Sequence, residues 1–585
     1  MSTNISKLHR EDLLDKIQQI RHYIASAPQD QNTGNLLQYL EELTKDVKGK
    51  KYGLVFEQHR EKIDEQLETH VPVLTEDKNL FIDSSGEMNF LIEGDNLAAL
   101  KLLEKTHKGK IDLIYIDPPY NTGKNEKQDF YYDDKFVDIN DTFRHSKWLS
   151  FMEKRLRIAR DLLTSQGVIF ISIDDNEQAD LKILCDEVFH SNFIAQMIWQ
   201  QGKKSSGNLV GVNHEYMLVY AKNRALIDKP EFAWKQRKQG LDKIYAKYNQ
   251  LKKKYKDDCV SIEREIKQWF ASLQENDPAY ASKHYSNVDS KGLFFADNSC
   301  APDKPETRCH KPLIHPITHK KTAVPSLGWR WKESTLDRMV QEDLIYYGDD
   351  ETCVPKVKKY LTEMETELPS SVFYKDGRGA SGELDKLLGG KKFNNPKDKD
   401  VIARILNFKT SSIILDFFAG SGTTGHSVLK LNAEDGGHRK FILCTNNENN
   451  ICRDVTYQRM KTIITGKRKD GSDYSEKYDA SLKYYKIDFV PISDKFYYEY
   501  ADELLLHIRE LVELENGINF NGNGEIAIVL TDDEMENFVA NYSDKTKVLY
   551  RGHNVLMTDK QEDFLKSHGI RVNVIPDYYY KELNK

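Results

Sequence analysis

The sequence lacks several features that define common classes of protein. No stretch approaches the roughly 18 uninterrupted apolar residues that a membrane-spanning helix needs. The polar N-terminus, from Met1 to Arg10, lacks the apolar core of a signal peptide. The seven cysteines form no Cys-x-x-Cys pair, which is typical of a reducing compartment rather than of a disulfide framework. We therefore expect a protein of the cytoplasm.

A metal centre is also not expected. One group of residues could supply zinc ligands, namely Cys300, Cys309, His310, His315, His319 and Cys353. No pair among them has the short spacing of a structural zinc site. We predict no metal.

The length of the chain indicates several structural units, and its charge distribution singles out one basic region. A chain of 585 residues is too long for one compact core, so two to four structural units are expected. The net charge of −7 argues against a protein that coats nucleic acid indiscriminately. Between Gln201 and Val260, however, the sequence has 14 Lys and Arg but only 6 Asp and Glu. That excess is typical of a surface that faces phosphates.

The chain begins with a helical pattern and then alternates strands with helices. Apolar residues at helical spacing from Ile5 to about Glu68 predict a helical N-terminal region, 1–75, which packs on its own core or contacts another subunit. Strands are predicted at 89–92, 111–116, 168–173, 412–417 and 440–444, and helices at 96–105, 144–163, 176–189, 399–406 and 424–431. Strands separated by single helices predict an α/β fold with a mostly parallel sheet.

This α/β pattern is interrupted once. Residues 76–221 form its first half and residues 371–466 its second. Between them, 222–370 is lysine-rich, then aromatic and irregular, and far longer than an ordinary loop. Within it, Trp329 and Trp331 are interpreted as core residues. The remainder, 467–585, is predicted to be a small separate module, with a helix at 502–514 and a strand at 525–530.

The strand at 111–116 stops at Asp117-Pro118-Pro119-Tyr120. Two consecutive prolines fix the backbone and remove two amide donors, so the loop presents mainly hydrogen-bond acceptors. The Asp117 carboxylate and the Pro118 carbonyl can accept hydrogen bonds from an exocyclic amine, and the Tyr120 ring can stack on the base that carries it. A simple proline turn explains the tetrapeptide equally well.

A second motif decides between these interpretations. The strand at 412–417 carries Asp416 and runs into a glycine-rich turn, Phe418-Ala419-Gly420-Ser421-Gly422-Thr423, and then a helix. Glycines there let the backbone approach a ligand closely. The turn has neither the lysine of a Walker loop nor the Gly-x-Gly-x-x-Gly spacing of a dinucleotide site. The acidic Asp416 suits a cofactor with a cationic amino group.

Together the two motifs resemble those of the amino-methyltransferases of restriction-modification systems, in the β-class order where Asp-Pro-Pro-Tyr precedes Phe-x-Gly-x-Gly. The resemblance implies a circularly permuted Rossmann-like methyltransferase fold that binds S-adenosyl-L-methionine. It implies that Asp117, Pro118, Pro119 and Tyr120 are catalytic, and that the insertion is a target recognition domain. The expected cofactor-binding residues of the turn are Asp416, Phe418, Gly420, Ser421, Gly422 and Thr423.

The resemblance also assigns weaker motifs. Asn395 and Lys397 in Phe-Asn-Asn-Pro-Lys resemble the segment that holds the methionine carboxylate of the cofactor. Asp95 resembles the residue that meets the cofactor's adenine amine, although it could simply cap the next helix. Many members of the family end the strand after the glycine-rich turn with an acidic residue that binds the ribose hydroxyls of the cofactor. Here that position is not acidic, so either Glu448, slightly further along the chain, takes the role, or Asn446 does so with a neutral contact.

A finer resemblance is to the modification subunits of type III restriction-modification systems. It rests on Tyr52-Gly53-Leu54-Val55-Phe56, His214-Glu215-Tyr216, Gly328-Trp329-Arg330-Trp331 and Thr445-Asn446-Asn447-Glu448-Asn449. It implies a homodimer that methylates adenine N6 in double-stranded DNA and associates with a separate restriction subunit containing helicase and nuclease activities.

Two rival functions remain, together with one expectation for DNA contacts. Cytosine-N4 methylation uses the same acceptors, although Asp117 favours adenine because family members acting on cytosine more often carry Ser there. A subunit that mainly targets a restriction complex to DNA is the other rival. Phosphate contacts are assigned to the basic residues beside the insertion, with a solvated surface as the alternative. These residues are Lys203, Lys204, Lys235, Arg237 and Lys238.

Overall fold

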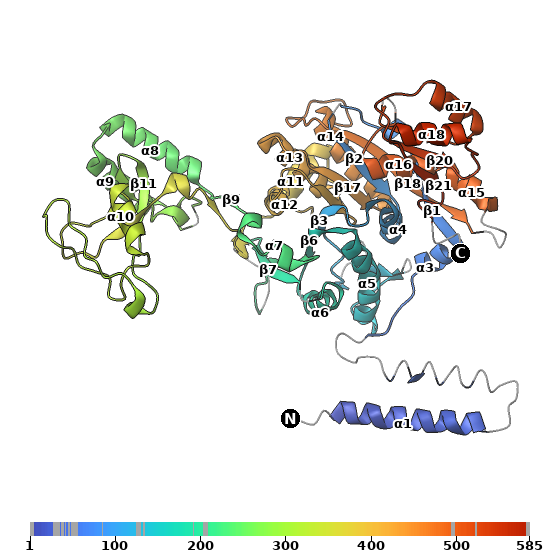
Figure 1. Ribbon diagram of the computed structural model, residues 1–585, viewed down its shortest axis with the longest axis horizontal. Coiled ribbons are helices and arrows are strands. Elements are labelled where there is room, and N and C mark those ends of the chain that lie inside the picture. The colour runs from blue at the N-terminus through green and yellow to red at the C-terminus, as the bar shows by residue number, and fades with distance from the viewer. Residues whose placement is uncertain are drawn as a thin grey trace. The chain divides into compact units, whose positions relative to one another are not determined.

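The computed structural model describes residues 5–26, 36, 40, 43–44, 47, 56–84, 86–123, 130–132, 135–190, 192–202, 209–275, 277–492, 498–520 and 523–580. The chain divides into two compact units, and Figure 1 labels the helices and strands of both. The main unit comprises residues 1–226, 371–403 and 410–585, and the inserted unit comprises 227–370 and 404–409. Across the described ranges, no helix is long and apolar enough to cross a membrane.

A ten-stranded sheet forms the centre of the main unit. In spatial order its strands are β1 (His70–Glu76), β18 (Ser481–Pro491), β2 (Met88–Glu93), β17 (Lys440–Thr445), β16 (Ile413–Asp416), β3 (Ile111–Ile116), β6 (Leu163–Ile173), β8 (His214–Ala221), β7 (Phe193–Gln200) and β15 (Val372–Tyr374). Neighbours from β18 to β6 run parallel, whereas β1 and β8 run antiparallel to their neighbours. The sheet is therefore mixed and mostly parallel, which confirms the predicted fold class.

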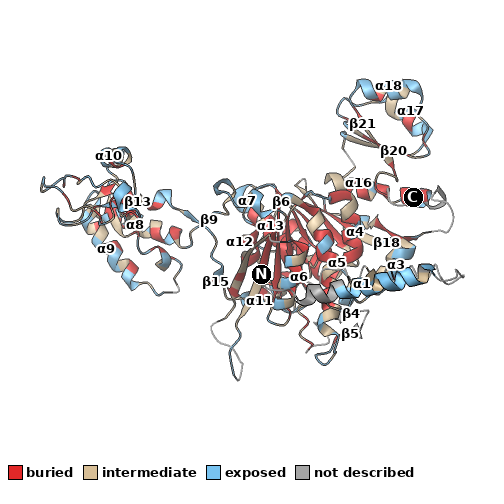
Figure 2. Cartoon of the chain, turned by 60° about the horizontal axis from the view of Figure 1, so that its bottom comes forward, coloured by how far each residue is buried: buried red, intermediate tan, exposed pale blue. Residues whose placement is uncertain are grey.

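Helices cover the sheet and bury its apolar residues. Those of the α/β core are α3 (Lys62–Thr69), α4 (Asn96–His107), α5 (Arg144–Leu162), α6 (Gln178–Val188), α11 (Gly379–Leu388), α12 (Lys399–Leu406), α13 (Thr423–Asp435) and α14 (Gln458–Thr465). The strands are rich in Ile and Leu, as expected for strands covered on both faces. Ile114 and Leu415 are fully buried, and Figure 2 shows the buried residues gathered on the strands.

Two strands that lie about 300 residues apart in sequence are neighbours in the sheet. Ile414 of β16 pairs with Leu113 of β3, and Leu415 pairs with Ile114, with both strands parallel. Because parallel strands end at the same edge, Asp117 and Asp416 leave the sheet side by side. The order of these two strands along the chain is the permuted one that the sequence predicts.

Two predicted domain boundaries are wrong. Residues 467–585 are not one separate module, because β18 lies inside the central sheet between β1 and β2. Residues 1–75 likewise include most of β1, which pairs with β18. Charged residues interrupt the apolar pattern of β18; Lys483, for example, is buried and pairs with Glu76 and Glu513. Because the carboxylates that pair with this lysine lie far away in sequence, the local pattern of β18 does not look like that of a buried strand.

The C-terminal part beyond β18 carries a small parallel sheet. Its elements are α15 (Tyr498–Leu505), α16 (Ile508–Asn516), β19 (Ile526–Val529), α17 (Asp532–Ala540), β20 (Val548–Gly552), α18 (Asp559–Ser567) and β21 (Arg571–Ile575). The single helix predicted at 502–514 is two helices, α15 and α16. Glu515 ties this part to the core, because it pairs with Lys110 and accepts hydrogen bonds from Tyr578 and Tyr579.

The inserted unit has its own core. It contains α8 (Leu241–Tyr255), α9 (Cys259–Ser272), α10 (Glu333–Gln341), the sheet β10 (Asn287–Asp289), β11 (Gly292–Asp297), β13 (Lys356–Tyr360), β12 (Ile345–Tyr346), and the pair β9 (Gln236–Arg237) and β14 (Thr366–Glu367). Trp329 is fully buried and donates from Nε1 to the Lys311 carbonyl at 2.8 Å. Trp331 packs against the same cluster. Trp329 is therefore a core residue, as predicted, and Trp331 is partly buried against the same core.

Candidate active site

The candidate site lies where the parallel strands of the main unit end. Asp95 follows β2, Asp117 follows β3, and Asp416 is the last residue of β16. In open α/β sheets, ligands bind outside the carboxyl ends of the strands. The sheet register therefore collects the two principal motifs at the edge where a ligand is expected.

Hydrogen bonds hold the Asp-Pro-Pro-Tyr tetrapeptide in place. The Tyr120 hydroxyl donates to Asp117 Oδ1 at 2.8 Å, and Trp148 Nε1 on α5 donates to the Pro119 carbonyl at 2.7 Å. The next residue, Asn121, is fully buried and has a left-handed φ of 56°. The loop is thus fixed by its own side chains and by α5.

Lys397 joins the second half of the chain to this tetrapeptide. Its Nζ lies 3.2 Å from Asp117 Oδ1 and donates to the Tyr120 hydroxyl at 2.7 Å and to Glu215 Oε2 at 2.7 Å. Tyr120 also donates to Glu215, at 3.3 Å. One cation therefore lies between two carboxylates, only one of which belongs to the predicted site.

Burial and charge shift the titration of this group. Burial raises the pKa of Asp117, Lys397 opposes that rise, and Glu215 adds to it. Burial by itself would lower the pKa of Lys397, but the carboxylates of Asp117 and Glu215 outweigh it and raise the pKa. Both carboxylates therefore stabilise the charged form of Lys397.

The glycine-rich turn needs its glycines. Gly420 has φ 48° and Gly422 has φ 75°, a region that disfavours side chains. A Cβ on Gly420 would lie 3.5 Å from Phe393 Cζ, and one on Gly422 would lie 3.1 Å from Thr456 Cγ2. The turn thus offers bare backbone to a ligand at the end of β16.

Asp416 shapes this turn from within. It is 2% exposed; Oδ2 accepts from the Thr424 hydroxyl at 2.5 Å and Oδ1 accepts from the Phe418 amide at 3.0 Å. Burial raises its pKa to about 7. Both oxygens accept hydrogen bonds from the turn and the first residues of α13, so Asp416 fixes the backbone of the turn, and its contact with a cofactor stays a prediction.

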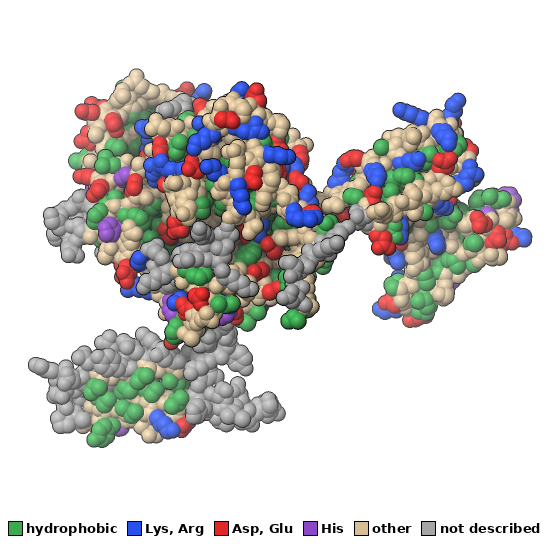
Figure 3. Space-filling model, turned by 180° about the vertical axis from the view of Figure 1, so that it is seen from behind, with side chains coloured by type: hydrophobic (Ala, Val, Ile, Leu, Met, Phe, Trp, Pro, Cys, Tyr) green, Lys and Arg blue, Asp and Glu red, His purple; other side chains and the backbone are tan. Residues whose placement is uncertain are grey.

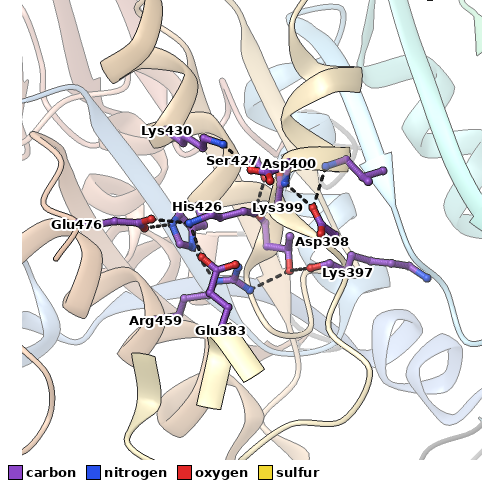
Figure 4. A network of polar contacts seen from close by, with 12 residues as sticks. Glu383, Lys397, Asp398, Lys399, Asp400, His426, Ser427, Lys430, Arg459 and Glu476 are labelled. Carbon is purple, nitrogen blue, oxygen red and sulfur yellow. Dashed lines mark hydrogen bonds and ion pairs between the residues drawn. The ribbon is translucent and has the colours of Figure 1, made fainter. Parts of the chain in front are cut away.

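Behind the turn lies a polar network that Figure 4 shows at close range. Arg459 Nη1 donates to Thr423 Oγ1 at 2.9 Å and to the carbonyl and hydroxyl oxygens of Ser421, each at 3.3 Å. His426 bridges Arg459 and Glu476, and Lys399 pairs with Glu476. The hydroxyls of Ser421 and Thr423 both accept from Arg459, and their contacts with the cofactor stay a prediction.

Lys397 and Lys399 have separate partners although they are two residues apart. In Figure 4 their side chains point in opposite directions. Lys399 reaches Glu383 and Glu476 behind the turn, whereas Lys397 reaches the tetrapeptide. The segment before α12 therefore supports the turn on one side and the catalytic loop on the other.

The remaining predicted cofactor residues take varied positions. Asp95 caps α4, accepting from the amides of Leu97 and Ala98, and lies 3.7 Å from Arg155. Glu448 and Asn395 are exposed near the carboxyl ends of the strands, and Asn395 has a φ of 51°. The capping role of Asp95 is thus present, and its side chain remains partly exposed to a ligand.

Three of the five residues predicted to contact DNA lie in the inserted unit. Lys203 and Lys204 lie outside the described residues. Lys235 is exposed, Arg237 pairs with Asp242 at 2.8 Å, and Lys238 donates to the Tyr285 hydroxyl at 2.9 Å. The last two partners belong to the same inserted unit.

Sequence reasoning missed two residues of the site. Glu215 contacts Lys397 and Tyr120, and Arg459 supports the glycine-rich turn. Glu215 stands in the His-Glu-Tyr triplet that carries part of the finer resemblance, but no role was assigned to it. Arg459 lies on a late helix, α14, where no local pattern marks it.

Comparison with known proteins defines the class. The family model described as DNA methylase matches residues 111–456, from β3 through the glycine-rich turn, which is more than half of the chain. The chain therefore belongs to this DNA methylase family.

Individual relatives narrow the comparison. The chain is 33% identical to the type III restriction-modification enzyme EcoP15I Mod subunit of Escherichia coli, over 63% of this chain and 60% of the relative. It is 34% identical to the EcoPI Mod subunit of Escherichia phage P1, over 64% and 60%. It is 31% identical to the type II methyltransferase M.KpnI of Klebsiella pneumoniae, over 71% and 93%. The matches to the type III relatives thus span about 60% of their length.

Solved structures add little to this. The cytosine-N4-specific PvuII DNA methyltransferase matches with a TM-score of 0.29 and 10% identity, over 62% of this chain and 86% of that one. A score that low carries no weight, so the fold rests on the strand order described above.

Proposed function

We propose that this chain is a site-specific DNA adenine-N6 methyltransferase that uses S-adenosyl-L-methionine. The observation that carries the proposal is the meeting of the two motifs. Asp117 and Asp416 end neighbouring parallel strands, and Lys397 links the segment before the glycine-rich turn to Asp117 and Tyr120. Membership of the DNA methylase family supports the same reaction class.

The residues at the strand ends fit the proposed cofactor. Gly420 and Gly422 leave room for close approach, Lys397 offers a cation for a carboxylate, and Asp95 and Glu448 offer acceptors for an amine or hydroxyls. When bound, S-adenosyl-L-methionine supplies an electrophilic methyl group on a sulfonium. The chain's own task is to align an amine with that group and to exclude other geometries.

The tetrapeptide supplies the acceptors for the amine. The Asp117 carboxylate and the Pro118 carbonyl would accept its two N–H groups and stabilise the positive charge that develops on nitrogen. The target adenine must leave the duplex, and the Tyr120 ring would stack on it. Asp117 need not take a proton during transfer, because the amine loses its proton more easily after methylation.

In this scheme Lys397 contacts both the catalytic loop and the carboxylate of the cofactor. It now contacts Asp117, Tyr120 and Glu215. A cofactor carboxylate would draw its ammonium away from Asp117 and leave the Asp117 oxygens available to the base. Glu215 would hold the lysine near both positions, because its 2.7 Å contact is the shorter of the two carboxylate contacts.

Adenine is preferred to cytosine as the substrate. Asp117 at the first motif position supports this preference, since related enzymes acting on cytosine more often carry Ser there. Cytosine-N4 methylation remains the alternative, because the acceptors would serve either amine.

The type III relatives support a role as modification and recognition subunit. In that role the inserted unit would recognise the target site in double-stranded DNA, and a separate restriction subunit would be a partner. A homodimer fits α1 (Ile5–Ser26), where Figure 3 shows hydrophobic side chains, with Ile20 49% and Tyr23 76% exposed. Acting on cellular DNA, the enzyme would work in the cytoplasm.

Substitution of Asp117 tests the proposal. Asp117→Ala should abolish transfer of radiolabelled methyl groups to DNA while binding of cofactor and DNA remains largely intact. The loss is expected because the developing positive nitrogen would lose its charged acceptor. A variant with near-normal rates would refute the assignment, and a wild-type chain that binds DNA but transfers no methyl would favour a targeting subunit.

A further inference from the structure

A second cluster of ligating side chains lies beside the catalytic loop. His145 stands at the start of α5, and Glu177 and Asp180 stand at the start of α6. His145 Nδ1 lies 2.7 Å from Glu177 Oε1 and 3.6 Å from Asp180 Oδ2. Each residue offers one ligand atom, and these three atoms lie within 4.8 Å of one another.

Two buried oxygens at this cluster lack partners. Glu177 and Asn121 are both fully buried, and neither Glu177 Oε2 nor Asn121 Oδ1 has a hydrogen-bond partner in the described part of the chain. An orphan acceptor in the interior costs free energy, roughly 1–3 kcal/mol and more for a charge. Both atoms are acceptors, so what they lack is a donor or a cation.

The groups around Glu177 also favour a bound cation. Its carboxylate and that of Asp180 share the His145 imidazole as a partner. Arg144 is hydrogen-bonded to the other ring nitrogen, His145 Nε2, at 3.2 Å. A carboxylate that is buried without full compensation is stabilised by a bound positive charge.

The spacing suits one divalent ion. Neighbouring ligands on an octahedral ion with bonds of about 2.1 Å lie roughly 3 Å apart. The separations of 2.7 and 3.6 Å lie on either side of that value. Carboxylates with a single imidazole are ligands that Mg²⁺ and Mn²⁺ accept, with water at the open positions.

We propose that His145, Glu177 and Asp180 form a binding site for one divalent cation of the Mg²⁺ or Mn²⁺ class. The ion orients the Glu177 carboxylate, whose Oε1 accepts from Asn121 Nδ2 at 2.5 Å. Asn121 directly follows Tyr120, so the ion braces the end of the catalytic loop. It touches none of the residues to which the methyl-transfer reaction was assigned above.

The experiment measures Mn²⁺ binding by the purified full chain from the electron paramagnetic resonance signal of the free ion. One Mn²⁺ per chain is expected for the wild type. His145→Ala and Asp180→Asn each remove a ligand from a partly exposed position and should weaken binding at least about tenfold. His438→Ala is the matched control, because exposed His438 also pairs with a carboxylate, Glu87, but lies at no such cluster.

Glu177→Gln separates an ion site from a plain hydrogen bond. A neutral amide is easier to bury than a carboxylate, so this variant should fold and melt no lower than the wild type in EDTA. Added Mn²⁺ should raise the melting temperature of the wild type and of His438→Ala, but not that of Glu177→Gln. A wild type that binds no Mn²⁺, or variants that all bind it alike, would overturn the proposal.

Discussion

Substitution of Glu215 probes the charge balance on which the proposed reaction depends. Glu215→Gln removes one negative charge and keeps the size of the side chain. Glu215 and Asp117 both contact Lys397 Nζ, at 2.7 and 3.2 Å, so their oxygens lie at most about 6 Å apart. The charge of Glu215 raises the pKa of Asp117, and its removal must lower that pKa.

The strength of the repulsion follows from that distance. Two charges about 6 Å apart at an effective dielectric constant of about 20 repel by roughly 3 kcal/mol. The two carboxylates are 29% and 19% exposed, so solvent screening reduces this repulsion to about half. Methyl transfer requires ionised Asp117, so the acidic limb of kcat against pH should move to lower pH.

The assay is the pH profile of methyl transfer at saturating DNA and cofactor. Asp175→Asn is the matched control: it also removes one carboxylate at this edge, next to Tyr216, but does not contact Lys397. Its acidic limb should stay where the wild type has it. A limb that stays put in Glu215→Gln, or moves to higher pH, would refute the assignment of that limb to Asp117.

Three further substitutions test the support of the site. Lys397→Met should weaken cofactor binding at least about tenfold in calorimetric titration, because a charge-assisted contact is lost; unchanged affinity would exclude its proposed role. Gly422→Ala should destabilise the fold by about 1–2 kcal/mol through its φ of 75° and a 3.1 Å contact, and by more than Gly436→Ala, which has similar φ but open space; equal melting temperatures would contradict this. Glu61→Gln removes the nearest carboxylate from buried Arg155, which it binds at 2.9 and 3.0 Å, and should cost about 2–3 kcal/mol because Asp95 still lies 3.7 Å from the guanidinium. Glu153→Gln, which breaks an exposed pair with Arg157, should cost at most about 0.5 kcal/mol, and similar losses in both would contradict the account.

The strands that carry the site could be predicted because their signals are local. β3 and β16 are short apolar runs that stop at prolines or glycines, and these breaks mark both strand ends in the sequence. That these two strands are neighbours in the sheet could be expected only from the resemblance to the family, with its permuted order of motifs. Alternating strands and helices likewise predicted the mostly parallel sheet.

The parts that were missed depend on distant partners. β18 contains Lys483, which becomes buried only because Glu513 and Glu76 lie against it. Glu215 joins the site because β8 runs antiparallel and starts at the edge where β6 ends. Neither pairing leaves a trace within a short window of sequence, so only the assembled sheet reveals them.

The most direct test of the central claim identifies the product of the reaction. The purified chain is incubated with DNA and labelled S-adenosyl-L-methionine, and the DNA is digested to nucleosides for mass spectrometry, with Asp117→Ala as the blank. The account predicts label in N6-methyladenine for the wild type and none for the variant. Label in N4-methylcytosine, or equal label in both proteins, would contradict it.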